Sequence, residues 1–261
     1  MKLKLIAAAV ALVASGSSFA TISGPYDGIA NTGVAAELFL TVWQQSGTGT
    51  GSVNRSFTWD TGVSMFDMQA NTGVNLFVNQ TVSGSNEWVA FLAAGTGALQ
   101  YSVVAGDLTD GTPTILSTFA GSSIATKTNL SQDNALNLIS QYTGANNPTG
   151  THATQANGAS FNISGDEFYM TNGSNTWQGS TGNNSVAVGS STIFGQMVKN
   201  GSNPGFNTIN TIYSGKMFFG QQGSDYVLQY QVQAVPEPTG IALALAGFGI
   251  VGFVARRRKS A

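Results

Sequence analysis

Residues 37–43 read Glu-Leu-Phe-Leu-Thr-Val-Trp, and this stretch alternates with a period of two. The aliphatic residues at positions 38, 40 and 42 fall on one face of an extended chain, and the aromatic residues Phe39 and Trp43 fall on the other. Alternation of this kind among β-branched and aromatic residues is typical of strands. The stretch therefore predicts a β-strand, and the neighbouring sequence can be interpreted from it.

Further stretches of the same kind follow along the chain, with turn dipeptides such as Asp110-Gly111 and Asn200-Gly201 between many of them. The stretches are residues 53–59, 74–78, 88–93, 99–105 and 226–232. Many short strands at this spacing are typical of a β-sandwich or a jelly roll. Residues 46–52 are rich in Gly and Ser, but they lie between two predicted strands, so we interpret them as a hairpin loop. We therefore expect residues 21–234 to form one mainly β, sandwich or jelly-roll-like domain.

One segment has helical periodicity instead. Ser131 is suited to cap a helix over residues 132–142, which Gly144 would end. The apolar stripe of this helix consists of Ala135, Leu136, Leu138, Ile139 and Tyr142. We expect the helix to lie over one open end or edge of the sandwich, where it would cover unpaired backbone groups. A helix that binds a partner is the alternative.

Composition excludes several classes of site. Charged side chains are only 8 % of the 261 residues, where about 25 % is usual, and the chain has no cysteine and one histidine. Disulfides, thiolate metal sites, cysteine nucleophiles and zinc sites with several histidines from one chain are therefore excluded. Nucleic acid is not an expected partner, because its phosphates are bound by clusters of Lys and Arg. We expect no cofactor.

The first twenty residues have the organisation of a secretory signal peptide. Lys2 and Lys4 form a short basic region, residues 5–14 are apolar, and Ser18 and Ala20 are small residues at the positions that signal peptidase reads. Ten apolar residues are too few to span a hydrocarbon layer of about 30 Å. We therefore predict cleavage after Ala20 and export of the protein across the inner membrane.

The last 27 residues, 235–261, combine three features in a fixed order. These are Pro236-Glu237-Pro238, then residues 239–255 without a charge, and then the basic tail Arg256, Arg257, Arg258 and Lys259. As a helix, residues 239–255 would be about 25 Å long, at the short end of what spans a bilayer. The basic tail would stay on the cytoplasmic side. This arrangement resembles the PEP-CTERM sorting signal of exported proteins of Gram-negative bacteria.

The resemblance implies the maturation route and the partners. Proteins with such a tail are exosortase substrates that are cleaved near the Pro-Glu-Pro motif and released to the cell surface or the extracellular matrix. Exosortase and signal peptidase would then be partners during export, and the C-terminal transmembrane helix would hold the chain in the membrane only transiently. An ordinary single-pass anchor after a chance Pro-Glu-Pro is the alternative.

Residues 21–234 carry four basic against eleven acidic side chains, a formal net charge of −7. Ser, Thr, Asn, Gln and Gly must therefore supply most of the solubility. A surface with so few charges is compatible with an extracellular polysaccharide, which a strongly charged protein would bind non-specifically. We accordingly expect a non-enzymatic structural or adhesive protein of biofilm or exopolysaccharide. The alternatives are a carbohydrate-binding module and a glycan-active enzyme that uses two carboxylates.

Few residues suggest a chemical site, and we expect neither catalytic nor metal-binding residues. His152 lies in the polar stretch 142–158, which is the best position for a mobile loop, and we interpret it as a solvated histidine. The adjacent Asp166 and Glu167 would point to opposite faces of a strand. Residues 107–111, Asp-Leu-Thr-Asp-Gly, are the best calcium candidate but lack EF-hand spacing, so a tight turn is preferred.

The four tryptophans are compatible with a sugar-binding surface, because sugar rings stack on exposed aromatic faces. Trp43, Trp59 and Trp88 lie in predicted strands, so packing in the core is the preferred interpretation for them. Trp177 lies in the Gly- and Ser-rich residues 173–182. It is therefore the tryptophan that we expect to be exposed and to contact a glycan.

Overall fold

The computed structural model describes residues 22–25, 36–44, 54–108, 112–152, 154–155, 157–164, 166, 177–182 and 184–232. The predicted signal peptide, the hairpin loop at 46–52, the Pro-Glu-Pro motif and the predicted transmembrane helix at 239–255 lie outside these residues. Within the described residues, no helix is both long and apolar enough to cross a membrane.

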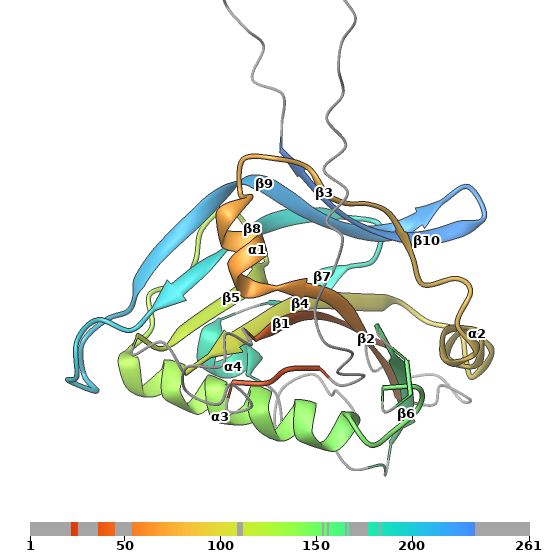
Figure 1. Cartoon of the computed structure of the whole chain (residues 1–261), viewed down its shortest axis with the longest axis horizontal. Coiled ribbons are helices and arrows are strands. Elements are labelled where there is room, and N and C mark those ends of the chain that lie inside the picture. The colour runs from red at the N-terminus through yellow and green to blue at the C-terminus, as the bar shows by residue number, and fades with distance from the viewer. Residues whose placement is uncertain are drawn as a thin grey trace, which may run out of the picture.

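The described strands belong to a single antiparallel sheet, so the predicted mainly β fold is confirmed, but as one curled sheet (Figure 1). Its strand order is β3-β10-β9-β8-β5-β4-β1-β2-β6, with β7 paired to β4. The strands are β1 (Glu37–Gln44), β2 (Arg55–Ser64), β3 (Leu76–Thr81), β4 (Leu99–Asp107), β5 (Thr114–Phe119), β6 (Ala159–Ile163), β7 (Val186–Ala187), β8 (Ser191–Val198), β9 (Ile209–Gln222) and β10 (Asp225–Val232).

Strand β1 lies inside the sheet, and both of its faces are buried. It pairs with β2 on one side, with Leu40 opposite Trp59, and with β4 on the other, with Leu40 opposite Val103. The antiparallel pairing of β1 and β2 agrees with the predicted hairpin. The sheet folds over so that β9 and β10 face β1, β2 and β4 (Figure 1).

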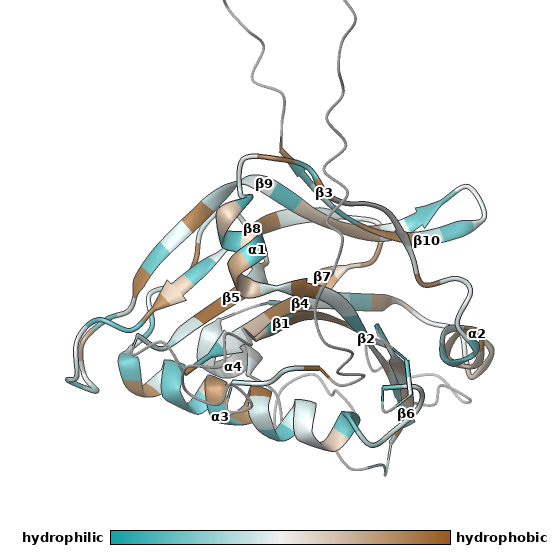
Figure 2. Ribbon diagram, viewed as in Figure 1, coloured by the Kyte–Doolittle hydropathy of each residue, from teal (hydrophilic) through white to brown (hydrophobic). Residues whose placement is uncertain are grey.

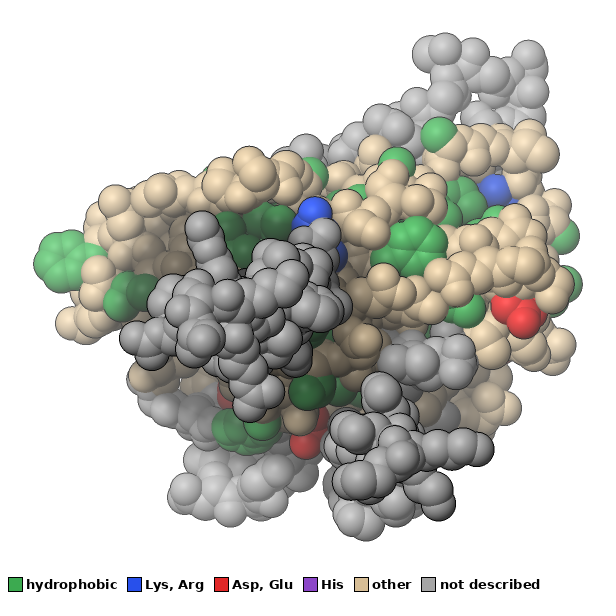
Figure 3. All heavy atoms as spheres, turned by 90° about the horizontal axis from the view of Figure 1, so that it is seen from above, with side chains coloured by type: hydrophobic (Ala, Val, Ile, Leu, Met, Phe, Trp, Pro, Cys, Tyr) green, Lys and Arg blue, Asp and Glu red, His purple; other side chains and the backbone are tan. Residues whose placement is uncertain are grey.

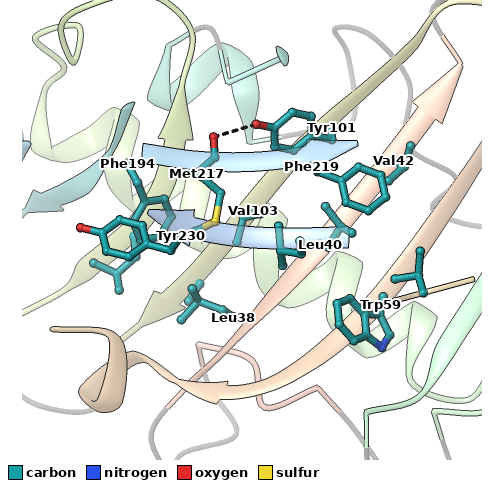
Figure 4. Close-up of a cluster of buried hydrophobic side chains, with 14 of the residues drawn as sticks. Leu38, Leu40, Val42, Trp59, Tyr101, Val103, Phe194, Met217, Phe219 and Tyr230 are labelled. Atoms are coloured by element: carbon teal, nitrogen blue, oxygen red, sulfur yellow. Dashed lines mark hydrogen bonds between the residues drawn. The ribbon is translucent and has the colours of Figure 1, made fainter. Parts of the chain in front are cut away.

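The main core lies between these two halves of the sheet (Figure 4). Brown and teal bands alternate along β9 in Figure 2, where Met217 and Phe219 are buried and Lys216 is exposed. Large members of this core are Leu38, Leu40, Val42, Phe57, Tyr101, Val103, Phe194, Met217, Phe219, Leu228 and Tyr230. Strands far apart in the sequence thus share one core because the sheet curls.

Two short helices lie beside this core, α1 (Met65–Ala70) and α2 (Asn86–Ala93). The predicted strand at 88–93 is wrong, since these residues form most of α2. The Ser85 hydroxyl caps this helix by accepting a hydrogen bond from the Trp88 backbone N–H at 3.1 Å. Trp88 and Phe91, three positions apart, are buried on its inner side. The hydrophobic periodicity of a short apolar run does not distinguish a strand from a helix.

The predicted helix at 132–142 is part of the longer α3 (Asn129–Asn146). Thr128, and not Ser131, is its cap, and the helix continues through Gly144. It covers the outer face of the sheet and not an edge or open end, because β1 presents Phe39 and Trp43 on that face. This second core consists of Ile22, Phe39, Trp43, Val104, Ile115, Ala135, Leu136, Ile139, Tyr142 and Trp177. The last helix is α4 (Gln178–Thr181).

Candidate functional site

The connection between β8 and β9, here called the tip (residues 199–208), is the most prominent exposed feature of the described residues (Figure 1). Residues 200–207 are all exposed, and Phe206 is 52 % exposed. Leu130 at the start of α3 and Ile209 at the start of β9 are also exposed. The tip therefore offers one aromatic ring among amide and hydroxyl side chains.

The tip is fastened to the first turn of α3 by one buried side chain. The Asn129 amide nitrogen Nδ2 donates to the carbonyl oxygens of Asn200 at 2.9 Å and Asn203 at 2.7 Å, and its Oδ1 accepts from the Asn200 N–H at 3.0 Å. The Asn129 N–H donates to the carbonyl oxygen of Phe206 at 2.8 Å. Lys199 forms an ion pair with Asp133 of α3 at 2.7 Å. These bonds pre-organise the loop that presents Phe206.

A second feature is a pair of carboxyl groups where β1 begins. Glu37 and Asp60 lie on the outer face of the sheet, next to a bulge in the β1–β2 pairing. Glu37 Oε2 accepts the Ser23 N–H at 3.1 Å, and Asp60 Oδ1 accepts the Gly62 N–H at 2.9 Å. Asp60 is almost fully buried.

Burial raises the pKa of both groups. Desolvation is the main cause of the increase in the pKa of Glu37 to about 7, and the charge of Asp60 adds to it. Desolvation also raises the pKa of Asp60 to about 6, although the Gly62 hydrogen bond opposes the increase. The pair can therefore hold a proton near neutral pH or bind a cation.

Trp177 is not the exposed tryptophan that we expected, because its side chain is 0 % exposed. Its ring packs edge-on against Phe39 and Tyr142, with ring centroids 5.7 Å and 5.2 Å away. A sugar ring cannot stack on an indole enclosed in this way. In the described residues, Trp177 is therefore part of the second core, and the exposed aromatic residues include Phe206 in the tip and Phe66 in α1.

His152 is likewise buried and not solvated. Among the described residues neither ring nitrogen has a hydrogen-bond partner, and burial lowers the pKa of His152 to about 4. The predicted loop at 142–158 begins inside α3, and the Thr151 N–H donates to the carbonyl oxygen of Ala159 at 2.8 Å. Within the described residues of this segment the imidazole is buried, whereas the mobility of the loop stays a prediction.

The structure describes only some of the acidic candidates. Asp107 ends β4, and Asp166 accepts the Ile163 N–H at 2.7 Å, whereas Asp110 and Glu167 lie outside the described residues. Within the described part of the chain, no three His, Cys, Asp or Glu side chains are placed to share a metal ion. Residues 109–111 of the calcium candidate lie outside the described residues, so that candidate stays a prediction.

The comparison with known family models concerns the C-terminal residues. The family model of the PEP-CTERM protein-sorting motif matches residues 234–259. The chain carries a PEP-CTERM sorting motif. The PEP-CTERM motif implies an exported protein that an exosortase sorts, with an exosortase-dependent surface or extracellular location. No curated protein and no solved structure matches the chain.

Sequence reasoning identified the motif but not the tip or the carboxyl pair. The Asn200-Gly201 dipeptide indicated a turn, yet the role of Asn129 depends on contacts made across more than seventy residues. Glu37 and Asp60 were counted among eleven acids, and only the pairing of β1 with β2 brings them to one face.

Proposed function

We propose that the protein is a non-enzymatic structural or adhesive component of the cell surface or extracellular matrix, associated with exopolysaccharide. The observation that carries this proposal is the PEP-CTERM motif at residues 234–259, joined to a domain with few charges. Most side chains on the face in Figure 3 are neutral, with few blue or red groups. Such a surface makes many weak contacts, which become strong together on a polymer matrix.

Carbohydrate binding at the tip is the second candidate. Phe206 supports it, because an exposed aromatic ring on a pre-organised loop can stack on a sugar. The neighbouring amides of Asn203 and Asn207 can donate to and accept from sugar hydroxyls. This surface replaces Trp177 as the proposed glycan contact.

The cellular experiment compares a deletion strain with strains that carry restored copies of the gene. The proposal expects the deletion to reduce cell aggregation or matrix retention and the full gene to restore it. A copy that lacks residues 235–261, or one with Arg256, Arg257 and Arg258 replaced by Ala, should be expressed but should not restore it. Restoration by either copy would contradict the role of the sorting motif.

The biochemical experiment separates binding from catalysis and uses protein recovered from the culture. Polysaccharide from the same culture serves as the probe, and pelleting measures binding. Phe206→Ala should reduce binding at least tenfold if the tip is the glycan site. Val89→Ala, which truncates an exposed apolar side chain on α2, is the control and should not. Release of reducing ends would favour the glycan-active enzyme and overturn the non-enzymatic proposal.

A further inference from the structure

The end of β10 is fastened to the loop between α1 and β3. The Val232 N–H donates to Asn75 Oδ1 at 2.8 Å. The Tyr230 hydroxyl donates to the Thr72 carbonyl oxygen at 2.8 Å, and the Ser214 hydroxyl donates to the same oxygen at 3.0 Å. In Figure 1, α1, this loop and the dark blue end of β10 lie together at the top. The point from which the chain continues toward the sorting motif is therefore fixed on one side of the domain.

The side chains exposed beside this point on α1 and its loop are apolar. Phe66 and Ala70 lie four positions apart on α1, so they share one face of the helix, and both are exposed. Val74 follows in the loop and is 47 % exposed. The acidic side chain of α1, Asp67, is half-buried and accepts a hydrogen bond from the Ser64 hydroxyl at 2.7 Å. An uncharged stripe thus runs from α1 to the end of β10.

A cation lies on the other side of the same point. Lys216 is exposed on β9 and pairs with Gln231, the residue before Val232. Figure 3 looks down on the top of Figure 1, and both green hydrophobic groups and blue cations are visible there. We call Phe66, Ala70, Val74 and Lys216 the exit patch. Apolar side chains next to a cation suit the surface of a bilayer that contains anionic lipids.

The length of the following chain limits how far the exit patch can be from a membrane. Six residues, 233–238, separate Val232 from the predicted transmembrane helix at 239–255. Whatever their conformation, they can span at most about 25 Å. A compact domain of this size is about 40 Å across. Because the connection is shorter than the domain is wide, the side with the exit patch must stay close to the bilayer.

We propose that the exit patch lies on the outer surface of the membrane for as long as the sorting helix is inserted. The apolar side chains enter the headgroup layer, and Lys216 meets the lipid phosphates. This inference rests on the predicted transmembrane helix and not on the proposed adhesive role. Three apolar side chains and one cation bind a bilayer only weakly by themselves. Removal of the sorting helix therefore also releases the domain from the lipid.

The experiment exploits the absence of cysteine, which allows a fluorophore to be attached at one chosen position. Gly73 and Gly84 lie just before and just after β3, both are exposed, and a Cβ at either would have no atom within 4 Å. The strand between them is about 20 Å long. Gly73→Cys therefore places the fluorophore beside the exit patch, and Gly84→Cys is the matched control at the far end of the strand.

The full-length protein is recovered from membranes of an exosortase-deficient strain, so that the sorting motif is retained. It is reconstituted in vesicles of phosphatidylethanolamine and phosphatidylglycerol, with and without a quencher on the lipid headgroups. We expect quenching to be at least threefold stronger at Gly73→Cys than at Gly84→Cys. Equal quenching at the two positions, or none at either, overturns the proposal. Absence of the protein from the membrane fraction overturns the predicted helix and the proposal with it.

A second comparison tests whether the patch itself makes the contact. Val74→Asp places a charge in the exit patch, and Val89→Asp places the same charge at an exposed valine of α2. In the Gly73→Cys chain, Val74→Asp should reduce quenching at least twofold, whereas Val89→Asp should leave it unchanged. Equal quenching in the two variants would show that the short connection alone holds the domain near the lipid, and this would overturn the contact.

Discussion

The hydroxyl of Tyr101 on β4 lies 3.0 Å from the main-chain carbonyl oxygen of Met217 on β9 (Figure 4). The same hydroxyl lies 2.9 Å from the carbonyl oxygen of Ser190, so its single proton can be donated to either. The Tyr101 ring itself packs against Phe219, with centroids 5.8 Å apart. One buried side chain thus joins the two facing halves of the curled sheet by a polar bond inside an apolar core.

Replacing Tyr101 with Phe should lower the free energy of unfolding by about 1–2 kcal/mol, because the ring is kept while a buried carbonyl loses its donor. Urea denaturation of the variant and the natural protein measures the difference. Tyr226→Phe is the matched control, since its hydroxyl has no hydrogen bond in the described residues, and it should change stability by less than about 0.5 kcal/mol. Equal losses in the two variants would contradict a structural role for the Tyr101 hydroxyl.

Gly62 has a positive φ of 65° at the bulge beside Asp60, and a Cβ there would lie 2.1 Å from Asn157 Oδ1. Gly62→Ala should therefore destabilise the protein by about 2–3 kcal/mol, from the left-handed backbone and the displaced Asn157 side chain. Gly223 has a similar φ of 63°, but a Cβ added at Gly223 would have no atom within 4 Å of it. Gly223→Ala should therefore lose only the backbone cost of about 1 kcal/mol. Chemical denaturation measures both variants, and the difference between their losses gives the cost of displacing Asn157.

The carboxyl pair should make the folded chain less stable as the pH rises. The pKa of Glu37 is raised to about 7 in the folded chain, so its favourable contribution is complete below about pH 4.5 and is lost as the pH rises through 7. The pKa of Asp60, raised to about 6, acts in the same direction. Relative to the natural protein, Glu37→Gln should therefore have a free energy of unfolding that is about 2 kcal/mol more favourable at pH 8 than at pH 4.

The measurement is the free energy of unfolding at pH 4, 6 and 8. Glu87→Gln is the comparison variant and should follow the natural protein at every pH. If Glu37→Gln and the natural protein have parallel profiles between pH 4 and pH 8, the pair does not have the raised pKa values that its burial implies.

His152 should make the protein less stable as the pH falls, which is opposite to the effect of the carboxyl pair. Because its pKa falls to about 4, the unfolded chain binds a proton below about pH 6.5 that the folded chain does not bind. Stability is therefore full above pH 6.5 and falls progressively toward pH 4, by about 3 kcal/mol. His152→Leu should remove this fall, as measured by denaturation at pH 4.5 and pH 7.5. A variant that loses stability on acidification as steeply as the natural protein would show that His152 is protonated inside the fold.

Much of the sheet could be predicted from the sequence because strand alternation is a local property. Residues 37–43, 99–105 and 226–232 lie within β1, β4 and β10. The segment 88–93 was assigned wrongly because its apolar residues suit both a strand and a short helix, and the Ser85 cap decides for the helix. The full extent of α3 (Asn129–Asn146) and its cap Thr128 do not follow from the sequence, because a cap residue is recognised by its backbone conformation, which a sequence does not record.

The candidate sites could not be predicted in the same way, because burial depends on contacts between distant segments. Trp177 is in a polar stretch, yet α3 and β1 enclose it. His152 is buried for the same kind of reason, and Phe206 is exposed although it is as apolar as the aromatic residues of the core. Local composition reports how polar a segment is, not which side of the fold it occupies.

By itself, the sequence determined the sorting motif at residues 234–259, the low charge and the mainly β character of the chain. Each of these follows from residue types at short spacing. Only the tertiary structure decided that one sheet curls over itself, that Asn129 fastens the tip and that the pairing of β1 with β2 puts Glu37 and Asp60 on the same face of the sheet. The physical reason is that strand pairing and core packing join residues separated by tens to hundreds of positions, and no local pattern encodes which of them will meet.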